Sequence, residues 1–304
     1  MASLGILIIT YNRPDDTLDL LRNLREQHNI ELVQEILILN NASTVSYEAV
    51  QHFIDENPAL AIRYIAHQEN LGVARGRNYL IQQATADYLM FLDDDVLFAD
   101  TKAVSHARTL LEEERYRNNH TAVVTFDIFY HASGARQVSA FPHKDLEGRQ
   151  HMSWFLTYYF TGAAHIMKRD FFEQTGLYPP DFFYGMEEYD LSYRIIEAGY
   201  TLAYDNRIRV LHKESPLGRV TNRQKIRMMW LNKSKVAWRY LPKRYFYSTA
   251  FMWGLFYLKK SRLDIAGYIR FYAKILAVPK TEKRSPISER SLHYLKSVAA
   301  RLWY

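Results

Sequence analysis

Three consecutive carboxylates follow a short apolar run in the stretch YLMFLDDDV, residues 88–96. Ionised carboxylates side by side repel one another unless a cation or several hydrogen-bond donors neutralise them. Hard oxygen ligands of this kind suit Mg²⁺ or Mn²⁺. Asp93, Asp94 and Asp95 are therefore candidate ligands of a divalent cation. For an isolated triplet, the alternative is a solvated acidic turn that caps the following helix.

A second acidic group, Glu187, Glu188 and Asp190, opens a predicted helix over 187–198. Acidic residues are common in a first helical turn because they bind free N–H groups and complement the helix dipole. Two adjacent carboxylates also raise each other's pKa, which suits a general base. The group is therefore either an ordinary helix start or a catalytic base with its neighbours.

Basic and histidine side chains complete the polar set. His212 ends a predicted strand over 200–211, and Arg75 and Arg77 lie at a predicted helix start, where anions bind favourably. Taken singly, such a histidine is more often structural than a ligand, and such arginines more often form an exposed basic face. The order of all these groups along the chain carries more information than any one of them.

The elements that must position these residues alternate between strands and helices. Apolar and β-branched runs predict strands over 6–9, 35–39, 61–66, 88–92 and 122–130. Apolar spacing predicts helices from Pro14 onward and over 46–57, 72–84 and 100–118. This alternation favours an α/β protein with a mainly parallel sheet, which binds ligands beyond the carboxyl ends of its strands. We expect hairpins or a loop over the sheet edge at 131–160, and a short helix at 168–176.

Composition sets the outer bounds. The chain has 304 residues, which allows one large domain or one domain with an appendage. It has no cysteine, which excludes disulfides and thiolate chemistry and fits a cytoplasmic protein. The first apolar run lacks a preceding basic region, so we expect a strand there and not a signal peptide. The sequence has no uninterrupted apolar window of about 18 residues, so we expect no membrane-spanning helix.

Charge is distributed unevenly along the chain. Residues 207–304 carry 23 Lys and Arg against 4 Asp and Glu, although the net charge of the whole chain is only +6. Beyond about residue 220, aromatic and basic residues recur at helical spacing, and residues 245–258 are uncharged between basic pairs. Such a segment is too short to span a bilayer and is suited to a membrane interface. The alternative is a helical subdomain with a buried aromatic core.

The motif order resembles family 2 glycosyltransferases, inverting enzymes with a GT-A fold that use nucleotide sugars. The matching stretches over roughly 4–215 are ILIITYNRPDDTLDLLRNL, ILILNNAST, ENLGVARGRN, FLDDDV and TGAAHIMKRDFFEQTGLYPPDFFYGMEEYDLSYRIIEAGY. The resemblance implies a Rossmann-like GT-A catalytic domain over 1–215, and we expect a basic, aromatic-rich helical extension over 216–304. The chain is similar to bacterial rhamnosyl- and galactofuranosyl-transferases of surface-polysaccharide synthesis.

The resemblance also implies roles for individual residues. It implies a donor site formed by Thr10, Tyr11, Asn12, Arg13, Asn40, Asn41, Asn70, Gly72, Arg77, Asn78, Asp93, Asp94 and Gly162. It implies Mn²⁺ or Mg²⁺ as the cofactor, with Asp93, Asp95 and His212 as its ligands.

The implied catalytic base is Glu188, the second member of the family's acidic pair, with Glu187 and Asp190 as rivals. The chain departs from the family at two of these positions. Glu188 stands where the family usually has Asp, and Asn40 stands where an Asp usually contacts the base of the nucleotide. Which nucleobase the donor site prefers is therefore left undecided by the sequence.

The implied reaction transfers one sugar from a nucleoside-diphosphate sugar, UDP- or dTDP-linked, to a hydroxyl of a glycan acceptor. The resemblance implies a lipid-linked acceptor at the inner face of the cytoplasmic membrane. We expect residues 216–304 to bind an anionic membrane surface peripherally, and we expect no nucleic-acid partner.

Three alternatives remain at this point. A metal-dependent nucleotidyltransferase would favour a glycine-rich, basic signature near the N-terminus, which TYNRPDD does not supply. A nucleic-acid-binding protein would use the basic and aromatic residues but leaves both acidic groups and His212 unexplained. An inactive sugar-nucleotide-binding module would keep the donor site and lack turnover.

Overall fold

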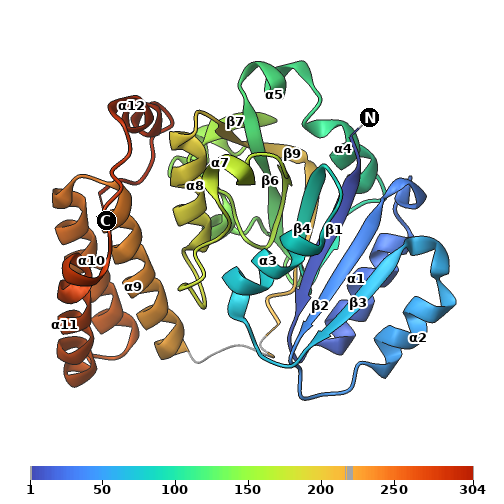
Figure 1. Cartoon of the computed structure of the whole chain (residues 1–304), viewed down its shortest axis with the longest axis horizontal. Coiled ribbons are helices and arrows are strands. Elements are labelled where there is room, and N and C mark those ends of the chain that lie inside the picture. The colour runs from blue at the N-terminus through green and yellow to red at the C-terminus, as the bar shows by residue number, and fades with distance from the viewer. Residues whose placement is uncertain (1, 216, 218–221, 304) are drawn as a thin grey trace.

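A single mixed sheet holds all the strands in the computed structural model, which describes residues 2–215, 217 and 222–303 (Figure 1). The strand bounds are Leu4–Thr10 (β1), Glu35–Asn41 (β2), Ile62–His67 (β3), Tyr88–Asp93 (β4), Val96–Phe98 (β5), Thr121–Tyr130 (β6), Trp154–Thr157 (β7), Ala164–Lys168 (β8) and Thr201–His212 (β9). Their order is β3-β2-β1-β4-β8-β6-β9-β5, and β7 also pairs with β9.

Most of the paired residues lie in parallel ladders, as predicted. Strands β3, β2, β1 and β4 are parallel to their neighbours, and β6 is parallel to β9. Strand β8 is antiparallel to both β4 and β6. The expected α/β class with a mainly parallel sheet is confirmed.

The described residues contain twelve α-helices. Their bounds are Pro14–Arg25 (α1), Glu48–Glu56 (α2), Gly72–Gln83 (α3), Ala103–Leu110 (α4), Glu114–Asn118 (α5), Leu146–Arg149 (α6), Phe172–Thr175 (α7), Glu187–Glu197 (α8), Asn222–Tyr240 (α9), Lys243–Lys260 (α10), Ile265–Thr281 (α11) and Glu289–Ser297 (α12). Three short 3₁₀ helices are Ile30–Leu32, Pro58–Leu60 and Val138–Ala140.

Local structure differs from the sequence prediction in three places. The single helix expected over 100–118 is two helices, α4 and α5. The region 131–160 contains helix α6 and strand β7, which pairs with β9 and not with a local hairpin partner. Strands β5 and β8 were not predicted. Each forms through pairing with a strand distant in sequence, which local periodicity cannot reveal.

Side chains that alternate along a strand point to opposite faces of the sheet, and each face is covered by its own helices. Ile6 and Ile8 of β1 pack in a core with residues of α1, α2 and α4. Leu7 belongs to a second core, which holds residues of α3 and α8. The sheet therefore lies between two helical layers, and its carboxyl edge is left for the loops that follow β1, β2 and β4.

The helices α9 to α12 lie beside α8, at the end of the molecule away from β3 (Figure 1). Trp230 of α9 is fully buried and stacks on Tyr257 and Tyr268 at ring-centre distances of 5.7 Å each. The same core cluster contains Trp230 and Leu7, so the C-terminal helices share a core with the sheet. The domain boundary near residue 215 stays a prediction. Among the described residues, no helix combines the length and apolar character needed to cross a bilayer.

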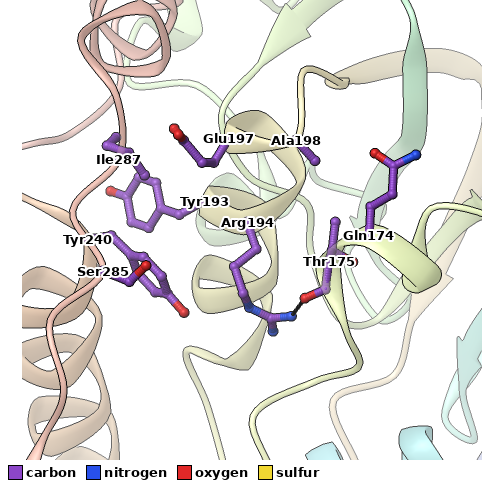
Figure 2. Close-up of a pocket in the computed structure, with 9 residues that line it drawn as sticks. All are labelled: Gln174, Thr175, Tyr193, Arg194, Glu197, Ala198, Tyr240, Ser285 and Ile287. Atoms are coloured by element: carbon purple, nitrogen blue, oxygen red, sulfur yellow. Dashed lines mark hydrogen bonds between the residues drawn. The ribbon is translucent and has the colours of Figure 1, made fainter.

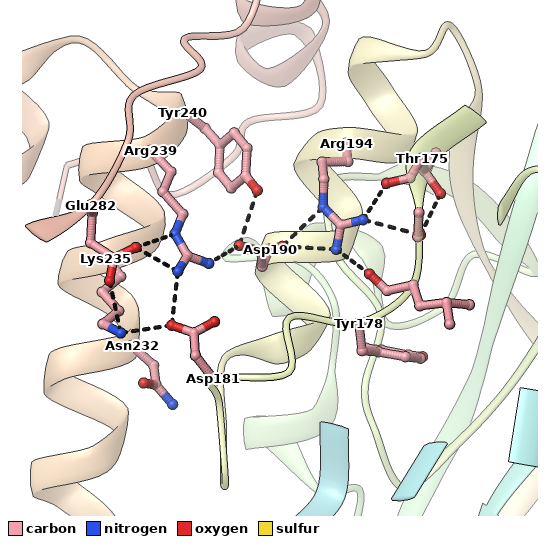
Figure 3. Close-up of polar contacts among 12 residues, drawn as sticks. Thr175, Tyr178, Asp181, Asp190, Arg194, Asn232, Lys235, Arg239, Tyr240 and Glu282 are labelled. Atoms are coloured by element: carbon pink, nitrogen blue, oxygen red, sulfur yellow. Dashed lines mark hydrogen bonds and ion pairs between the residues drawn. The ribbon is translucent and has the colours of Figure 1, made fainter. Parts of the chain in front are cut away.

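Ion pairs fasten α9 to α8 and to the loop before α8 (Figure 3). Arg239 lies 2.9 Å from Asp190 and 2.8 Å from Asp181, and it also binds Glu282 at 2.6 Å. Lys235 binds Asp181 at 2.6 Å and Glu282 at 2.9 Å. The C-terminal helices thereby hold the helix whose first turn carries the predicted catalytic acids.

Candidate active site

The predicted metal ligands come together at the carboxyl edge of the sheet. Asp93 ends β4, Asp95 lies in the turn before β5, and His212 ends β9, opposite Val96 of β5. One ligand atom from each of Asp93, Asp95 and His212 lies within 4.8 Å of the other two. Two carboxylates and an imidazole are a donor set that fits Mn²⁺ or Mg²⁺. Their role as ligands stays a prediction, because proximity alone does not show binding.

The orientation of His212 is set by a residue that the sequence did not indicate. The Oε1 atom of Gln137 accepts a hydrogen bond of 3.0 Å from His212 Nδ1, and Gln137 Nε2 donates one of 2.9 Å to Glu214. The proton of the neutral imidazole therefore resides on Nδ1, and Nε2 faces Asp95 Oδ1 at 3.3 Å. A single glutamine in the irregular segment after β6 has no sequence signature, so only the fold reveals it.

Gln137→Leu is expected to lower the affinity for Mn²⁺ by about tenfold or more, because hydrogen bonds of this kind fix the tautomer and aim of a ligating histidine. The measurement is a calorimetric Mn²⁺ titration in the presence of a nucleoside diphosphate. Gln34→Leu, at an exposed glutamine whose amide bonds Thr85, is the matched control. Equal affinities for Gln137→Leu and the unmodified protein would contradict this role.

Arg13 forms ion pairs with two members of the acidic triplet. Its Nη1 atom is 2.7 Å from Asp94 Oδ1 and 3.3 Å from Asp95 Oδ2, and its Nε donates to the Leu217 carbonyl at 2.7 Å. Burial raises the pKa of Asp94 to about 7, although the charge of Arg13 opposes the shift. The chain itself thus supplies part of the positive charge that three adjacent carboxylates require.

Arg77 connects the acidic triplet to the acidic helix start. This buried side chain, on α3, donates from Nη1 to Glu188 at 3.0 Å and to Glu187 at 3.3 Å. Its Nη2 donates to the Gly162 carbonyl at 3.0 Å and lies 3.9 Å from Asp93 Oδ1. The ring of Tyr178, another residue that the sequence did not single out, lies 5.4 Å from the guanidinium. One cation therefore joins the candidate metal site to the candidate base.

The two adjacent glutamates differ in their access to a substrate. Glu187 is 2% exposed, and burial followed by the charge of Glu188 raises its pKa to about 8. The side chain of Glu188 is 15% exposed. A Cβ atom on Gly162 would overlap Glu188 Oε1 and the Arg77 guanidinium, so glycine is needed for this close approach. The accessible carboxylate is Glu188.

Asp190 does not join this cluster, although it lies only two residues from Glu188. It binds Arg194 at 2.8 Å, Arg239 at 2.9 Å and the Tyr240 hydroxyl at 3.0 Å (Figure 3). The helix turns its side chain toward α9, away from Arg77. The structure therefore gives Asp190 a structural place and leaves Glu187 and Glu188 as the candidates for the base.

The loops after β1 and β2 are tied together by the predicted donor-site residues. Asn12, at a backbone φ of 56°, accepts from Thr44 N at 2.7 Å. Asn40 accepts from Ser43 N at 2.9 Å and donates to the Tyr64 hydroxyl at 2.6 Å. These amides shape the rim of the carboxyl edge.

The remaining residues predicted to form the donor site differ in their burial. Thr10 is buried and bonds Thr17 at 2.8 Å and Tyr47 at 2.6 Å, whereas Tyr11 is only half-buried. Asn41 donates to Asn70 at 3.1 Å.

Gly72 and Asn78 support the site from α3. Gly72 has a φ of 71° and lies against the Phe183 carbonyl, where a Cβ would come within 2.6 Å. Asn78 exchanges two hydrogen bonds of 2.9 Å with the backbone of Tyr178. For this group, contact with a nucleotide stays a prediction.

A cavity of about 230 Å³ lies between α8 and the C-terminal segment, away from this cluster (Figure 2). Arg194, in its lining, donates to the Leu177 carbonyl at 2.7 Å, and Glu197 accepts from Ser288 N at 2.8 Å. Its charged groups are already bound by the protein, and its lining contains no predicted metal ligand and neither Glu187 nor Glu188. The cluster around Arg77 is the better candidate for the active site.

Comparisons with known proteins also indicate a glycosyltransferase. A family model described as "Glycosyl transferase family 2" matches residues 5–176. An uncharacterized protein of Haemophilus influenzae is 30% identical over 179 residues, which are 58% of this chain and 92% of that protein.

Two solved structures share the fold. TarS 1–349 of S. aureus, in complex with UDP-GlcNAc, has a TM-score of 0.62 and 13% identity, covering 99% of this chain and 89% of that one. The mannosyltransferase PcManGT of Pyrobaculum calidifontis, in complex with GDP-Man and Mn²⁺, has a TM-score of 0.59 and 17% identity, covering 100% and 81%. These similarities confirm the expected GT-A architecture. Because the family model spans more than half of the chain, the chain belongs to glycosyl transferase family 2.

Proposed function

We propose that this glycosyltransferase transfers one sugar from a nucleoside-diphosphate sugar to an acceptor hydroxyl, with inversion and with a divalent cation. The observation that carries the proposal is the position of Arg77, 3.0 Å from Glu188 and 3.9 Å from Asp93. Inverting transfer needs a base on one side of the sugar and a stabilised leaving group on the other. Arg77 lies between groups suited to each task.

The cation would be held by Asp93, Asp95 and His212, whose ligand atoms are already grouped. When bound, it would supply positive charge to the diphosphate oxygens of the departing nucleotide. The chain's own contribution is to orient His212 through Gln137 and to balance the buried acids through Arg13. The presence of Mn²⁺ in the related mannosyltransferase structure supports this assignment.

The base in this proposal is Glu188. Arg77 fixes the position of its carboxylate, which takes the proton of the acceptor hydroxyl as that oxygen bonds to the anomeric carbon. The bond from that carbon to the diphosphate breaks on the opposite side, so the configuration inverts. The protein forms no covalent intermediate. The proton remains on Glu188 until solvent removes it.

We propose UDP or dTDP as the nucleotide of the donor, and the test is calorimetry with UDP, dTDP, GDP and CMP, each with and without Mn²⁺. We expect UDP or dTDP to bind only when Mn²⁺ is present, because the acidic cluster repels a bare diphosphate. The UDP-GlcNAc and GDP-Man complexes show that proteins of this fold bind donors with different nucleobases, so all four nucleotides are needed. The absence of binding to any of them would contradict the transferase proposal.

We further propose a lipid-linked glycan acceptor at the inner face of the bacterial cytoplasmic membrane, in surface-polysaccharide synthesis. Helices α10 and α11 support membrane contact because they expose large apolar side chains, namely Tyr247, Phe251, Met252, Leu255, Phe256, Ile265, Ile269 and Leu276. Neither helix contains an acidic residue, and both carry Lys or Arg. Exposed apolar residues with basic neighbours are the composition that anionic membrane surfaces bind.

Binding to phosphatidylglycerol vesicles at low salt is expected for the unmodified protein, and binding to phosphatidylcholine vesicles is expected to be much weaker. The double substitution Phe251→Ser and Phe256→Ser is expected to lower vesicle affinity by about tenfold or more, because two aromatic rings that would be buried in the membrane interface are removed. Vesicle flotation measures both effects. Leu32→Ser, at an exposed leucine outside α10 and α11, is the control. Failure of the unmodified protein to bind anionic vesicles would exclude the membrane proposal.

A further inference from the structure

A buried lysine, in contact with the residue that follows the candidate base, has no role in the proposed reaction. Lys233, on α9, is 8% exposed, and its Nζ lies 3.4 Å from the centre of the Tyr189 ring. No ion pair of Lys233 occurs among the described residues. By contrast, Lys235 on the same helix binds both Asp181 and Glu282. The helix therefore compensates one of these charges and leaves the other without a carboxylate.

The position of Lys233 connects it to the reaction centre. Tyr189 directly follows Glu188 on α8, and its ring stacks on Tyr159 at 4.7 Å with an interplanar angle of 6°. Lys233 and Tyr159 must occupy opposite faces of the Tyr189 ring, because both cannot fit on one face. Burial raises the pKa of Tyr159, and the nearby charges of Tyr158 and Glu188 add to the shift. An aromatic wall therefore runs from the surroundings of Glu188 to the Lys233 ammonium.

A second cation lies near this wall. Arg301 is exposed and follows α12, and its charge acts on both Lys233 and Tyr159. Burial and the proximity of Arg301 lower the pKa of Lys233 to about 7. No carboxylate pairs with Arg301 in the part of the chain that the structure describes. The charged form of buried Lys233 is therefore costly beside Arg301 when no acidic partner is present, whereas a bound anion would stabilise that charged form.

A structural explanation for Lys233 is weaker. The stem of a lysine can pack against an aromatic ring, but methionine or leucine would fill the same space without burying an ammonium group. A residue that costs stability, and that an aromatic pair connects to the candidate base, is typical of a binding site.

We propose that Lys233, together with Arg301, binds an anionic group of the acceptor, a carboxylate or a phosphate. The inference rests on the proposed transfer reaction and adds to it the class of acceptor, which is an acidic glycan rather than a neutral one. The carboxylate of a uronic acid and a phosphate on the glycan or its lipid carrier are the two sources of this chemistry. Both would place the anion at the end of the wall that begins at Glu188.

The test is an NMR titration of the protein, saturated with UDP or dTDP and Mn²⁺, with three probes. Methyl glucuronide carries a carboxylate, glycerol 1-phosphate carries a phosphate, and methyl glucoside is neutral. We expect one of the two anionic probes to bind and the neutral glucoside to bind at least tenfold more weakly. Binding of the glucuronide identifies a uronate, and binding of glycerol 1-phosphate identifies a phosphate.

Lys233→Met is expected to lower the affinity for the anionic probe by about tenfold or more, through loss of a charge-assisted hydrogen bond. The same substitution is expected to raise the Tm, because it removes a buried ammonium group. Weaker probe binding together with a higher Tm cannot result from misfolding. Lys280→Met removes the same charge from an exposed position on α11 and is the control. Arg301→Gln, at an exposed residue, is a second variant that tests the same site without changing a buried side chain.

Two results would overturn the inference. One is the absence of binding of either anionic probe to the unmodified protein. The other is unchanged probe affinity in both Lys233→Met and Arg301→Gln. Nucleotide binding is measured in every variant, because loss of the anion site leaves it intact. Failure of the transferase proposal, by contrast, would abolish nucleotide binding in the unmodified protein as well.

Discussion

Glu188→Gln is expected to lower the rate of sugar transfer by about 10²–10⁴-fold, the contribution of a positioned general base. The amide keeps an oxygen that can accept from Arg77, but it cannot take a proton from the acceptor hydroxyl. Nucleotide binding with Mn²⁺ should stay within about threefold, because Glu188 is not among the grouped metal ligands. The measurement is transfer of radiolabelled sugar from the donor to a bacterial lipid extract, with nucleotide affinity determined in parallel.

Glu187→Gln is the matched comparison for this experiment. Burial and the charge of Glu188 raise the pKa of Glu187 to about 8, so this carboxyl is mainly protonated at neutral pH. A glutamine resembles the protonated acid, and we expect transfer to fall by less than about tenfold. An equal loss in both variants would show that Glu187, or the pair acting together, is the base.

The same pKa shift has a consequence for stability. Between the ordinary pKa of 4.5 and about 8, folded Glu187 holds a proton that the unfolded chain has released. The free energy of unfolding therefore falls as pH rises through this window. Glu187→Gln should remove that part of the pH dependence, which denaturant unfolding at pH 5 and pH 8 measures.

Asp93→Asn is expected to lower Mn²⁺-dependent nucleotide binding by about 100-fold or more. The Asp93 side chain is 42% exposed, and its ion pair with Arg77 is long, at 3.9 Å. Its substitution therefore removes a charged ligand with little effect on packing. A calorimetric titration of Mn²⁺ into protein and nucleotide measures the loss, and circular dichroism checks the fold.

Asp94→Asn, in the same triplet, is the control for the metal experiment. Asp94 is buried against Arg13 at 2.7 Å and is not part of the grouped ligand set. We expect it to reduce metal affinity far less than Asp93→Asn does. Equal losses in the two variants would show that the triplet acts through its total charge, and unaltered binding in Asp93→Asn would exclude Asp93 as a ligand.

The aromatic residues of the C-terminal region divide between buried and exposed positions, and membrane contact of the exposed ones stays a prediction. These aromatic residues were expected either at a membrane interface or in a buried core. Trp230 and Tyr257 are buried, whereas Phe251 and Phe256 of α10 are exposed. Helical spacing predicts that a helix forms, but which of its faces is covered depends on neighbouring helices.

The sequence by itself determined the α/β class and the main elements near the site. The apolar runs that became β1, β2 and β4 each end in polar residues, so their carboxyl edges were recognisable. The motif order also indicated family 2 and the acidic groups around Asp93 and Glu188. These features are readable because periodicity and motif spacing are local properties of the chain.

The tertiary structure decided which charged groups meet. Arg77 joins Glu188 to Asp93, Gln137 orients His212, and Asp190 turns away to bind Arg239. In each case the partners come from elements that are distant in sequence and brought together by strand pairing and helix packing. The partner of a charged side chain, and hence its chemistry, depends on those long-range contacts, which residue type and spacing do not encode.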